Sequence, residues 1–373
     1  MTADLKGSPL RPLSRLEREV FETPAVLKKT ATAGRALAEL KGLAASIPDQ
    51  AILINTLSLQ EAKDSSAIEN IVTTHDELFR NDTYPELLAS PAAKEVRHYV
   101  HALRAGFDLV HQSGLLTTNH LVAIQGVLAL NNAGLRKLPG TTLKDGAGRI
   151  VYTPPQTSDE VIALMRDLDR FVNDDESLDA DPLIKMAIAH HQFESIHPFY
   201  DGNGRTGRIM NVLYLVNKEL LDIPVLYLSN HIVRNKADYY RLLQAVRDRA
   251  DAPEAWQAWV LYMLTAVENT AQQTIQTVTD IKVALQDYKH RIRAQFRFYS
   301  QDLINNLFMH PYTKIEFVER DLEVSRLTAT KYLADLANAG FVRKVKIGRS
   351  NYYINVALNA ILTRDQMSGA TPA

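Results

Sequence analysis

The residues best suited to chemistry lie in one short stretch, His197 to Arg208, with the sequence HPFYDGNGRTGR. Gly202 and Gly204 allow backbone conformations in which successive N–H groups converge on an anion. A helix is expected to follow from near Arg205, and its start adds free N–H groups and a positive dipole end. Because Arg205 and Arg208 are three residues apart, both lie near that first turn. The stretch predicts a binding site for two or three phosphates.

Two further side chains of this stretch supply the groups that act on bound phosphates. Asp201 lies at the edge of the glycine loop, and Mg²⁺ typically binds one or two carboxylates together with phosphate oxygens. His197 follows a predicted helix, and its unperturbed pKa near neutrality suits a general base. A base, a metal ligand and a phosphate site are the parts needed for attack of a hydroxyl on phosphorus.

At every defining position the stretch matches the pattern HxFx(D/E)GNGRxxR, and over roughly residues 50–250 the chain resembles the Fic family. It is most similar to the bacterial branch with an N-terminal extension and a C-terminal winged helix. The resemblance implies a protein adenylyltransferase, which moves AMP from ATP to a Ser, Thr or Tyr hydroxyl of a protein, including itself. The substrate is then ATP, with Mg²⁺ or Mn²⁺ as cofactor.

The resemblance also implies residue roles. His197 would deprotonate the target hydroxyl, Phe199 would pack inward, and Asp201 would hold the metal ion. Arg205 would contact the β-phosphate and Arg208 the γ-phosphate. The 138–155 hairpin would be the flap that binds the target protein as an added strand. The complete set of ATP-binding residues implied is Gly202, Asn203, Gly204, Arg205, Thr206, Gly207, Arg208, Tyr239 and Tyr240, the two tyrosines near the adenine.

Two other interpretations of this region have less support. Gly202, Gly204 and Gly207 satisfy G-x-G-x-x-G, with Asp222 twenty residues after Gly202, as in dinucleotide-binding folds. That motif requires a preceding buried strand, and here a helical segment precedes it. His190, His191 and Glu194 resemble zinc ligands but lack the His-Glu-x-x-His order, so structural polar contacts are expected instead.

A second motif, Ser65-Ser-Ala-Ile-Glu69-Asn70, matches the inhibitory pattern (S/T)xxxE(G/N) of the same family. Ser65 and Glu69 are four residues apart and so lie on one helix face. Glu69 is expected to pair with Arg208 and to occupy the space and charge that the γ-phosphate needs. The alternative is a solvent-facing glutamate on an amphipathic helix.

Rival functions remain open at the level of sequence. Fic relatives also transfer other groups or remove AMP, and the intact Gly202 to Arg205 core favours nucleotidyl transfer. A non-enzymatic alternative is a nucleotide-sensing DNA-binding regulator, which would need neither His197 nor Asp201.

Composition indicates an ordinary soluble globular protein of 373 residues, with a net charge of −1 and no cysteine. Disulfides, thiolate metal sites and a cysteine nucleophile are excluded. The chain shows no signal peptide and no apolar run of membrane-spanning length, so a cytoplasmic location without membrane partners is expected.

Helical periodicity dominates, which predicts a mainly α fold with one β-hairpin flap whose tip lies near Asp145-Gly146. One helical region, 52–79, is expected to break near Asp64-Ser65. Thr118 and Ser158 are expected to cap two other helices. The remaining predicted helices cover 25–47, 91–112, 182–196, 205–216, 235–250 and 253–296.

The tail is predicted as a winged helix-turn-helix, with helices 301–308, 313–321 and 327–339 and strands 341–347 and 351–354 joined at Gly348. Its basic residues, Arg326, Lys331, Arg343, Lys344, Lys346 and Arg349, suit a phosphate backbone, although such units also bind proteins. DNA, a docked protein and a second copy of the chain are candidate partners. The predicted regions are 1–95 (N-terminal helices with the inhibitory helix), 96–250 (catalytic core), 251–297 (connecting helices), 298–364 (winged helix) and 365–373 (disordered tail).

Overall fold

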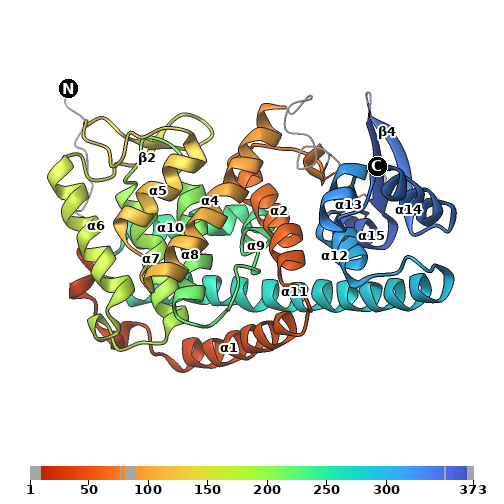
Figure 1. Ribbon diagram of the computed structural model, residues 1–373. Coiled ribbons are helices and arrows are strands. Elements are labelled where there is room, and N and C mark those ends of the chain that lie inside the picture. Colours follow the sequence, from red (N-terminus) through yellow and green to blue (C-terminus); the bar gives the residue numbers. More distant parts are fainter. Residues whose placement is uncertain (1–9, 76, 80–89, 348–349, 368–373) are drawn as a thin grey trace, which may run out of the picture.

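A computed structural model of the chain describes residues 10–75, 77–79, 90–347 and 350–367, and it confirms a mainly helical fold (Figure 1). A long helix, α11 (Pro253–Gln295), runs from the main helical body to a smaller C-terminal unit, with α1 (Pro24–Ala45) beside it. The other helices of the body are α2 (Ala51–Ile68), α4 (Pro91–Ser113), α5 (Thr118–Ala129), α6 (Ser158–Asn173), α7 (Pro182–Ile196), α8 (Asn203–Asn217), α9 (Ser229–Arg234) and α10 (Lys236–Asp248). Three short 3-10 helices cover Leu13–Arg15, Arg18–Val20 and Asp175–Ser177.

Helix α7 is the centre of the body, since every residue from Leu183 to Ile196 is buried. It packs against α6, α8 and α11. Its polar side chains are buried together with its apolar ones, and buried polar groups need partners within the protein. The segment therefore presents its last residue, and the loop that follows it, at a fixed place in the molecule.

The helix caps lie one residue before the predicted ones. Thr117, rather than Thr118, caps α5, and Thr157, rather than Ser158, caps α6. In each case the threonine hydroxyl accepts the backbone N–H three residues ahead, and Glu160 completes a capping box with Thr157. At both sites the next hydroxyl residue is the first residue of the helix itself.

Helix α2 is continuous, so the predicted break near Asp64-Ser65 is wrong. Both side chains are buried and bond to other elements instead of capping a helix. Asp64 accepts from Asn230 Nδ2 at 2.8 Å, and Ser65 Oγ accepts from Arg208 Nε at 2.7 Å. Tertiary partners thus overrode a local preference for helix ends.

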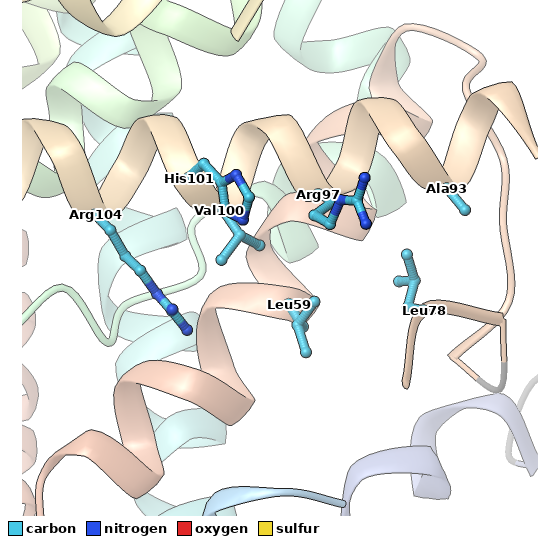
Figure 2. Close-up of a pocket in the computed structure, with 7 residues that line it drawn as sticks. All are labelled: Leu59, Leu78, Ala93, Arg97, Val100, His101 and Arg104. Atoms are coloured by element: carbon cyan, nitrogen blue, oxygen red, sulfur yellow. The ribbon is translucent and has the colours of Figure 1, made fainter. Parts of the chain in front are cut away.

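Helix α4 holds α2 in place along its length. A small hollow of about 10 Å³ lies between them. Figure 2 shows Leu59 of α2 below Val100 of α4, and Ala93 of α4 above Leu78. Arg104 donates to Asn55 Oδ1 at 2.5 Å, and the Tyr99 hydroxyl donates to Glu61 at 2.9 Å. The position of α2 is therefore set by polar as well as apolar contacts.

The predicted hairpin is confirmed as β1 (Leu143–Lys144) and β2 (Ile150–Tyr152), which pair antiparallel with Leu143 opposite Tyr152. The Asp145 N–H donates to the Arg149 carbonyl at 2.9 Å and closes the turn. In Figure 1 this hairpin lies above α5 and α6, at the end of the body far from the C-terminal unit.

The C-terminal unit has the predicted succession of three helices followed by two strands. Its elements are α12 (Gln301–Met309), β3 (Tyr312–Thr313), α13 (Ile315–Asp321), α14 (Arg326–Asn338), β4 (Val342–Ile347), β5 (Ser350–Asn355) and α15 (Val356–Met367). Thr313 lies in a third strand rather than in a helix, because β3 pairs with β5 in a sheet of order β3-β5-β4. Helix α15 extends through residues 365–367, which were expected to be disordered. Gly348, Arg349 and residues 368–373 lie outside the described residues.

Candidate active site

His197 ends α7 in the left-handed conformation, with φ of 51°. A non-glycine residue adopts this conformation only where the surroundings enforce it. Arg136 supplies that constraint, since its Nε donates to the His197 carbonyl at 2.8 Å and its Nη2 to the Ile196 carbonyl at 3.1 Å. The chain therefore turns sharply at His197 into the loop 198–202.

The loop is closed by the Asn203 side chain. Asn203 Oδ1 accepts the Phe199 N–H at 2.8 Å, and Asn203 Nδ2 donates to the Phe199 carbonyl at 2.7 Å. Phe199 is fully buried against Phe193, as predicted. The Asn203 amide thus holds the loop itself, while its backbone N–H remains at the helix start.

Helix α8 begins at Asn203, directly after Gly202 in the left-handed conformation with φ of 75°. The first N–H groups of a helix have no partner within it. The Gly202 N–H donates to Asp201 Oδ1 at 2.7 Å, and no described residue accepts from the N–H groups of Asn203, Gly204 and Arg205. These groups and the helix dipole form an anion-binding helix start.

Thr206 and Gly207 lie on the inner side of α8. Thr206 is fully buried, and a Cβ on Gly207 would approach the side chains of Phe193 and Glu194 to 3.0 Å. Gly207 therefore permits the close packing of α8 on α7.

The His197 imidazole is largely shielded, and its Nδ1 has no hydrogen-bond partner among the described residues. Burial lowers the pKa of His197 to about 4, with further contributions from the charges of Arg247 and Arg136. The ring is therefore neutral at physiological pH, which is the form that accepts a proton.

Asp201 is the acidic residue of the loop, and its side chain is 72% exposed. No cluster of three or more metal-binding side chains occurs within the described part of the chain. A lone exposed carboxylate fits Mg²⁺ only where phosphate oxygens and water complete the coordination. Asp201 fits a metal ion that arrives with a nucleotide.

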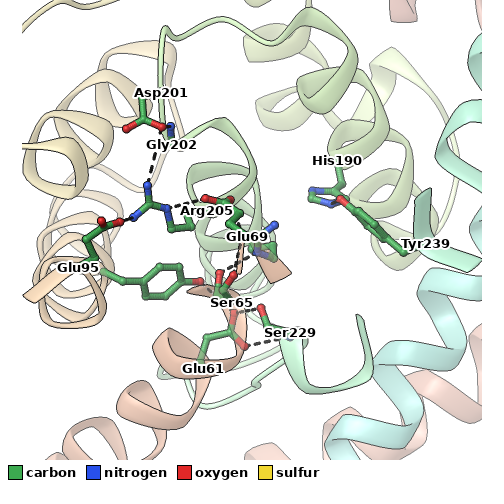
Figure 3. Close-up of polar contacts among 12 residues, drawn as sticks. Glu61, Ser65, Glu69, Glu95, His190, Asp201, Gly202, Arg205, Ser229 and Tyr239 are labelled. Carbon is green, nitrogen blue, oxygen red and sulfur yellow. Dashed lines mark hydrogen bonds and ion pairs between the residues drawn. The ribbon is translucent and has the colours of Figure 1, made fainter. Parts of the chain in front are cut away.

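Arg205 and Arg208 are both buried and both bind Glu69, at the end of α2. Figure 3 shows the contact of Glu69 with Arg205. Glu69 Oε2 lies 2.9 Å from Arg205 Nε, and Glu69 Oε1 lies 2.8 Å from Arg208 Nη2. The predicted pairing of Glu69 with Arg208 is thus present and extends to Arg205. The carboxylate lies so close to the start of α8 that a Cβ on Gly204 would be 2.7 Å from Oε1.

Ser65 completes this contact. Its Oγ accepts from Arg208 Nε, and its carbonyl accepts from Arg208 Nη2 at 3.0 Å. Burial alone would lower the pKa of Arg208, but Glu69, Tyr239, Glu194 and Tyr99 together outweigh it and the pKa is raised. Asn70 follows in the left-handed conformation, and its Oδ1 accepts from Lys236 at 3.2 Å.

The two tyrosines predicted near the adenine lie in different environments. Tyr239 is 2% exposed, and its hydroxyl lies 2.9 Å from His190 Nε2. Tyr240 is 46% exposed and so presents ring surface to solvent. The polar contacts expected for His190 and His191 are confirmed, since His191 Nε2 lies 3.3 Å from the Leu243 carbonyl. For Glu194 the expectation is not met at Oε1, which is buried without a hydrogen-bond partner among the described residues.

The sequence did not reveal the residues that join the hairpin to the catalytic loop. Besides its bonds to residues 196 and 197, Arg136 donates to the Pro155 carbonyl, at the far end of the hairpin. The Tyr200 hydroxyl accepts the N–H groups of Lys137 at 2.9 Å and Leu138 at 3.3 Å. Arg136 lies outside any motif, and Tyr200 occupies a variable position of the motif. Because both bond to backbone groups, no partner side chain in the sequence pointed to them.

A third connection runs through Tyr152 of β2. Its hydroxyl donates to the Ser195 carbonyl at 3.1 Å, and the Arg247 guanidinium lies 4.2 Å from its ring centroid. Arg247 also donates to Ser195 Oγ and to the Glu194 carbonyl.

The sequence also gave no indication of two carboxylates on other elements, Glu61 and Glu95. Burial raises the pKa of Glu61 to about 7, although Ser229 and Tyr99 donate to it.

Three regions of the chain match known families. Residues 27–108 match the Fic/DOC family N-terminal region, residues 115–215 match the Fic/DOC family, and residues 284–358 match the C-terminal domain of SoFic-like protein adenylyltransferases. The second match includes the loop 198–202, Arg205 and Arg208. The chain belongs to the Fic/DOC family.

Curated Fic relatives are similar over part of their length. The chain is 31% identical over 159 residues to protein adenylyltransferase fic-1 of Caenorhabditis elegans and 28% identical to that of Caenorhabditis briggsae. Each match covers 40% of this chain and 29% of the relative. The chain therefore corresponds to less than a third of the length of these relatives.

Solved Fic structures share the fold. A Fic family protein from Desulfovibrio desulfuricans matches 94% of this chain and 98% of its own, with a TM-score of 0.56 and 21% identity. Fic-1 from Caenorhabditis elegans matches 69% of this chain and 74% of its own, with a TM-score of 0.51 and 18% identity. Among the described residues no helix is both long and apolar enough to span a membrane.

Proposed function

We propose that this Fic protein transfers AMP from ATP to a Ser, Thr or Tyr hydroxyl of a protein, itself included, and that Glu69 restrains the reaction. The observation that carries the proposal is the start of α8, where free N–H groups lie beside the Glu69 contacts of Arg205 and Arg208, and where the loop that begins at His197 ends. Such an arrangement binds a polyphosphate next to a neutral base. The curated relatives named protein adenylyltransferases support the same activity.

In the proposed reaction the nucleotide phosphates lie against the first turn of α8. His197 takes the proton of the target hydroxyl, whose oxygen forms a bond to the α-phosphorus of ATP. The bond from that phosphorus to the bridging oxygen breaks, and pyrophosphate leaves. A Mg²⁺ or Mn²⁺ ion held by Asp201 would supply positive charge to the phosphates. Arg205 and Arg208 would bind the β- and γ-phosphates, and the exposed ring of Tyr240 would pack near the adenine.

Glu69 would act as the brake because it already fills an anion position between the two arginines. A triphosphate in the same place would meet a fixed negative charge and lose both guanidinium contacts. Ser65 and Asn70 would support the brake, Ser65 through Arg208 and Asn70 through Lys236. Movement of Glu69 would free the site for productive binding.

The hairpin 138–155 would bind the target segment. Ile150 and Val151 of β2 are 53% and 44% exposed, and the strands have only each other as partners among the described residues. An extended peptide could add to this two-stranded sheet through its backbone groups. Because Tyr152 and Arg136 join the hairpin to residues 195–197, the added strand would lie near His197.

The test is incubation of the purified protein with ATP labelled at the α-phosphate, in parallel with ATP labelled at the γ-phosphate. We expect protein-bound label from the α-position only, stronger in Glu69→Gly than in wild type and absent in His197→Ala. The exposed His111→Ala is the matched control for loss of a histidine. Label from the γ-position would indicate phosphate transfer, and no label in any variant would contradict the proposal.

The same experiment separates the remaining alternatives. Competition by unlabelled UTP or GTP as strong as by ATP would indicate another nucleotide preference. Release of label from modified protein by the wild type, but not by Glu69→Gly, would indicate an AMP-removing activity.

A second proposal concerns the C-terminal unit, which we propose contacts a nucleic acid backbone as a winged helix. Arg343, Lys344 and Lys346 of β4 are exposed, as are Arg326 and Lys331 of α14. Binding of the whole protein to duplex DNA should then weaken steeply with salt, and Lys344→Gln/Lys346→Gln should reduce that slope by about 1 to 2. Salt-independent binding, or none, would favour a protein-docking role.

A further inference from the structure

Arg205 faces three carboxylates, one of which it shares with Arg208. Arg205 is 4% exposed, and the three carboxylates come from different elements (Figure 3). Glu69 Oε2 lies 2.9 Å from Nε, Glu95 Oε2 lies 2.8 Å from Nη1, and Asp201 Oδ1 lies 3.9 Å from Nη2. The proposed function accounts for Glu69 and Asp201 but leaves Glu95 without a role.

The three carboxylates occupy different parts of the guanidinium. Nε and Nη2 form one edge with two parallel N–H groups, which is the edge that binds a carboxylate or phosphate in bidentate fashion. Glu69 and Asp201 lie on this edge. Glu95 instead binds Nη1, where the geometry satisfies a full hydrogen bond. The Glu95 contact can therefore persist when a phosphate replaces Glu69.

Glu95 also belongs to a different element from the brake. It lies in the first turns of α4, whereas Glu69 ends α2, so movement of Glu69 need not disturb it. Its side chain is 41% exposed and has no other hydrogen bond or ion pair to the described residues. Packing alone gives no reason for an acid at this position.

We propose that Glu95 is a positioning residue that holds Nη1 of Arg205, so that the Nε–Nη2 edge stays turned toward the β-phosphate of a bound nucleotide. This inference rests on the proposed function. Without Glu95 the long arginine side chain would regain rotational freedom once Glu69 moves away, and ordering it again would weaken phosphate binding. Glu95 thus assists nucleotide binding, in contrast to Glu69.

The experiment compares nucleotides with and without a β-phosphate. Calorimetry would give the affinities for ATP and AMP of Glu69→Gly and of Glu69→Gly/Glu95→Gln, with Glu69→Gly/Asp108→Asn as a control on the exposed face of α4. We expect Glu95→Gln to weaken ATP binding about tenfold, the effect of one well-placed polar contact. AMP binding and the melting temperature should stay unchanged, and Glu95→Asp should recover part of the ATP affinity.

Each outcome decides the role of Glu95. Tighter ATP binding in the Glu95→Gln variant would mean that Glu95 competes with the phosphate, and this overturns the proposal. An unchanged ratio of ATP to AMP affinity also overturns it, yet leaves the proposed activity intact. Failure of Glu69→Gly itself to bind ATP would overturn both proposals.

Discussion

The catalytic loop and the brake differ in the kind of partner that holds them. On the loop side, Arg136, Tyr200 and Asn203 bond to backbone groups, namely the carbonyls of residues 155, 196, 197 and 199 and the N–H groups of 137, 138 and 199. On the brake side, Glu69 binds the charged side chains of Arg205 and Arg208. A backbone partner cannot be exchanged without unfolding, whereas an ion pair can be replaced by another anion. The loop side is thus a fixed frame, and the brake side is an exchangeable contact.

Removal of Arg136 should have the largest effect, because it tests the frame directly. Arg136→Met would keep much of the side-chain volume but leave buried carbonyls without donors, which costs about 3 kcal/mol or more in the free energy of unfolding. Urea unfolding measures this loss. Arg166→Met, at an exposed position of α6, is the control and should change stability little. Equal stability of the two variants would show that the frame does not depend on Arg136.

The pH dependence of the reaction tests whether the frame also sets the state of the base. The pKa of His197 is lowered to about 4, so the neutral base is present above about pH 4 and is lost below it. At pH 5.5 a histidine with an ordinary pKa would be only about one tenth neutral. Label transfer by Glu69→Gly should therefore stay nearly constant from pH 7 to 5.5. A tenfold fall over that range, in protein that remains folded, would contradict this prediction.

Ser65→Ala tests the brake side with a smaller change. The variant removes the acceptor for Arg208 Nε but keeps Glu69, so we expect a rise in self-modification of about fivefold, equivalent to about 1 kcal/mol. Ser66→Ala is a closely matched control, because Ser66 is equally buried and its Oγ has no partner among the described residues. Equal rates in the two variants would show that Ser65 does not support the brake.

The same contrast explains what could be predicted from the sequence. The sequence predicts the pairing of Glu69 with Arg208, because each residue belongs to a motif of the family and the side chains of the two motifs meet each other. The hairpin and the long helices followed from local patterns, and the inward packing of Phe199 was implied by the family resemblance. Arg136 and Tyr200 could not be found, since a side chain that bonds to backbone leaves no complementary residue to search for. Glu95 was missed because its partner, Arg205, had already been assigned to a phosphate.

Local sequence preferences also gave a wrong prediction for α2, namely the break near Asp64-Ser65. Asp64 and Ser65 are residues that favour helix ends, yet both lie inside a continuous helix because Asn230 and Arg208 satisfy their side chains. These partners are more than 140 residues away in the chain. The predicted break was therefore a sign of a buried polar site rather than of a helix end.

Tyr200→Phe should have the smallest effect. It tests whether the fixed frame around the catalytic loop extends outward to the hairpin. Tyr200 is 51% exposed, so loss of its hydroxyl leaves water able to reach the N–H groups of Lys137 and Leu138. We expect hydrogen exchange at these two amides to accelerate about fivefold, because only the local opening is made easier. Hydrogen exchange at the amides of residues 199–203 should remain unchanged, since the bonds by which Asn203 closes the loop do not involve the Tyr200 hydroxyl. Tyr240→Phe is the matched control, because it removes a hydroxyl that has no hydrogen bond to the described residues from a residue that is 46% exposed. If exchange also accelerated at 199–203, the hairpin and the loop would open as one unit, and the frame would extend outward to the surface that we propose binds the target.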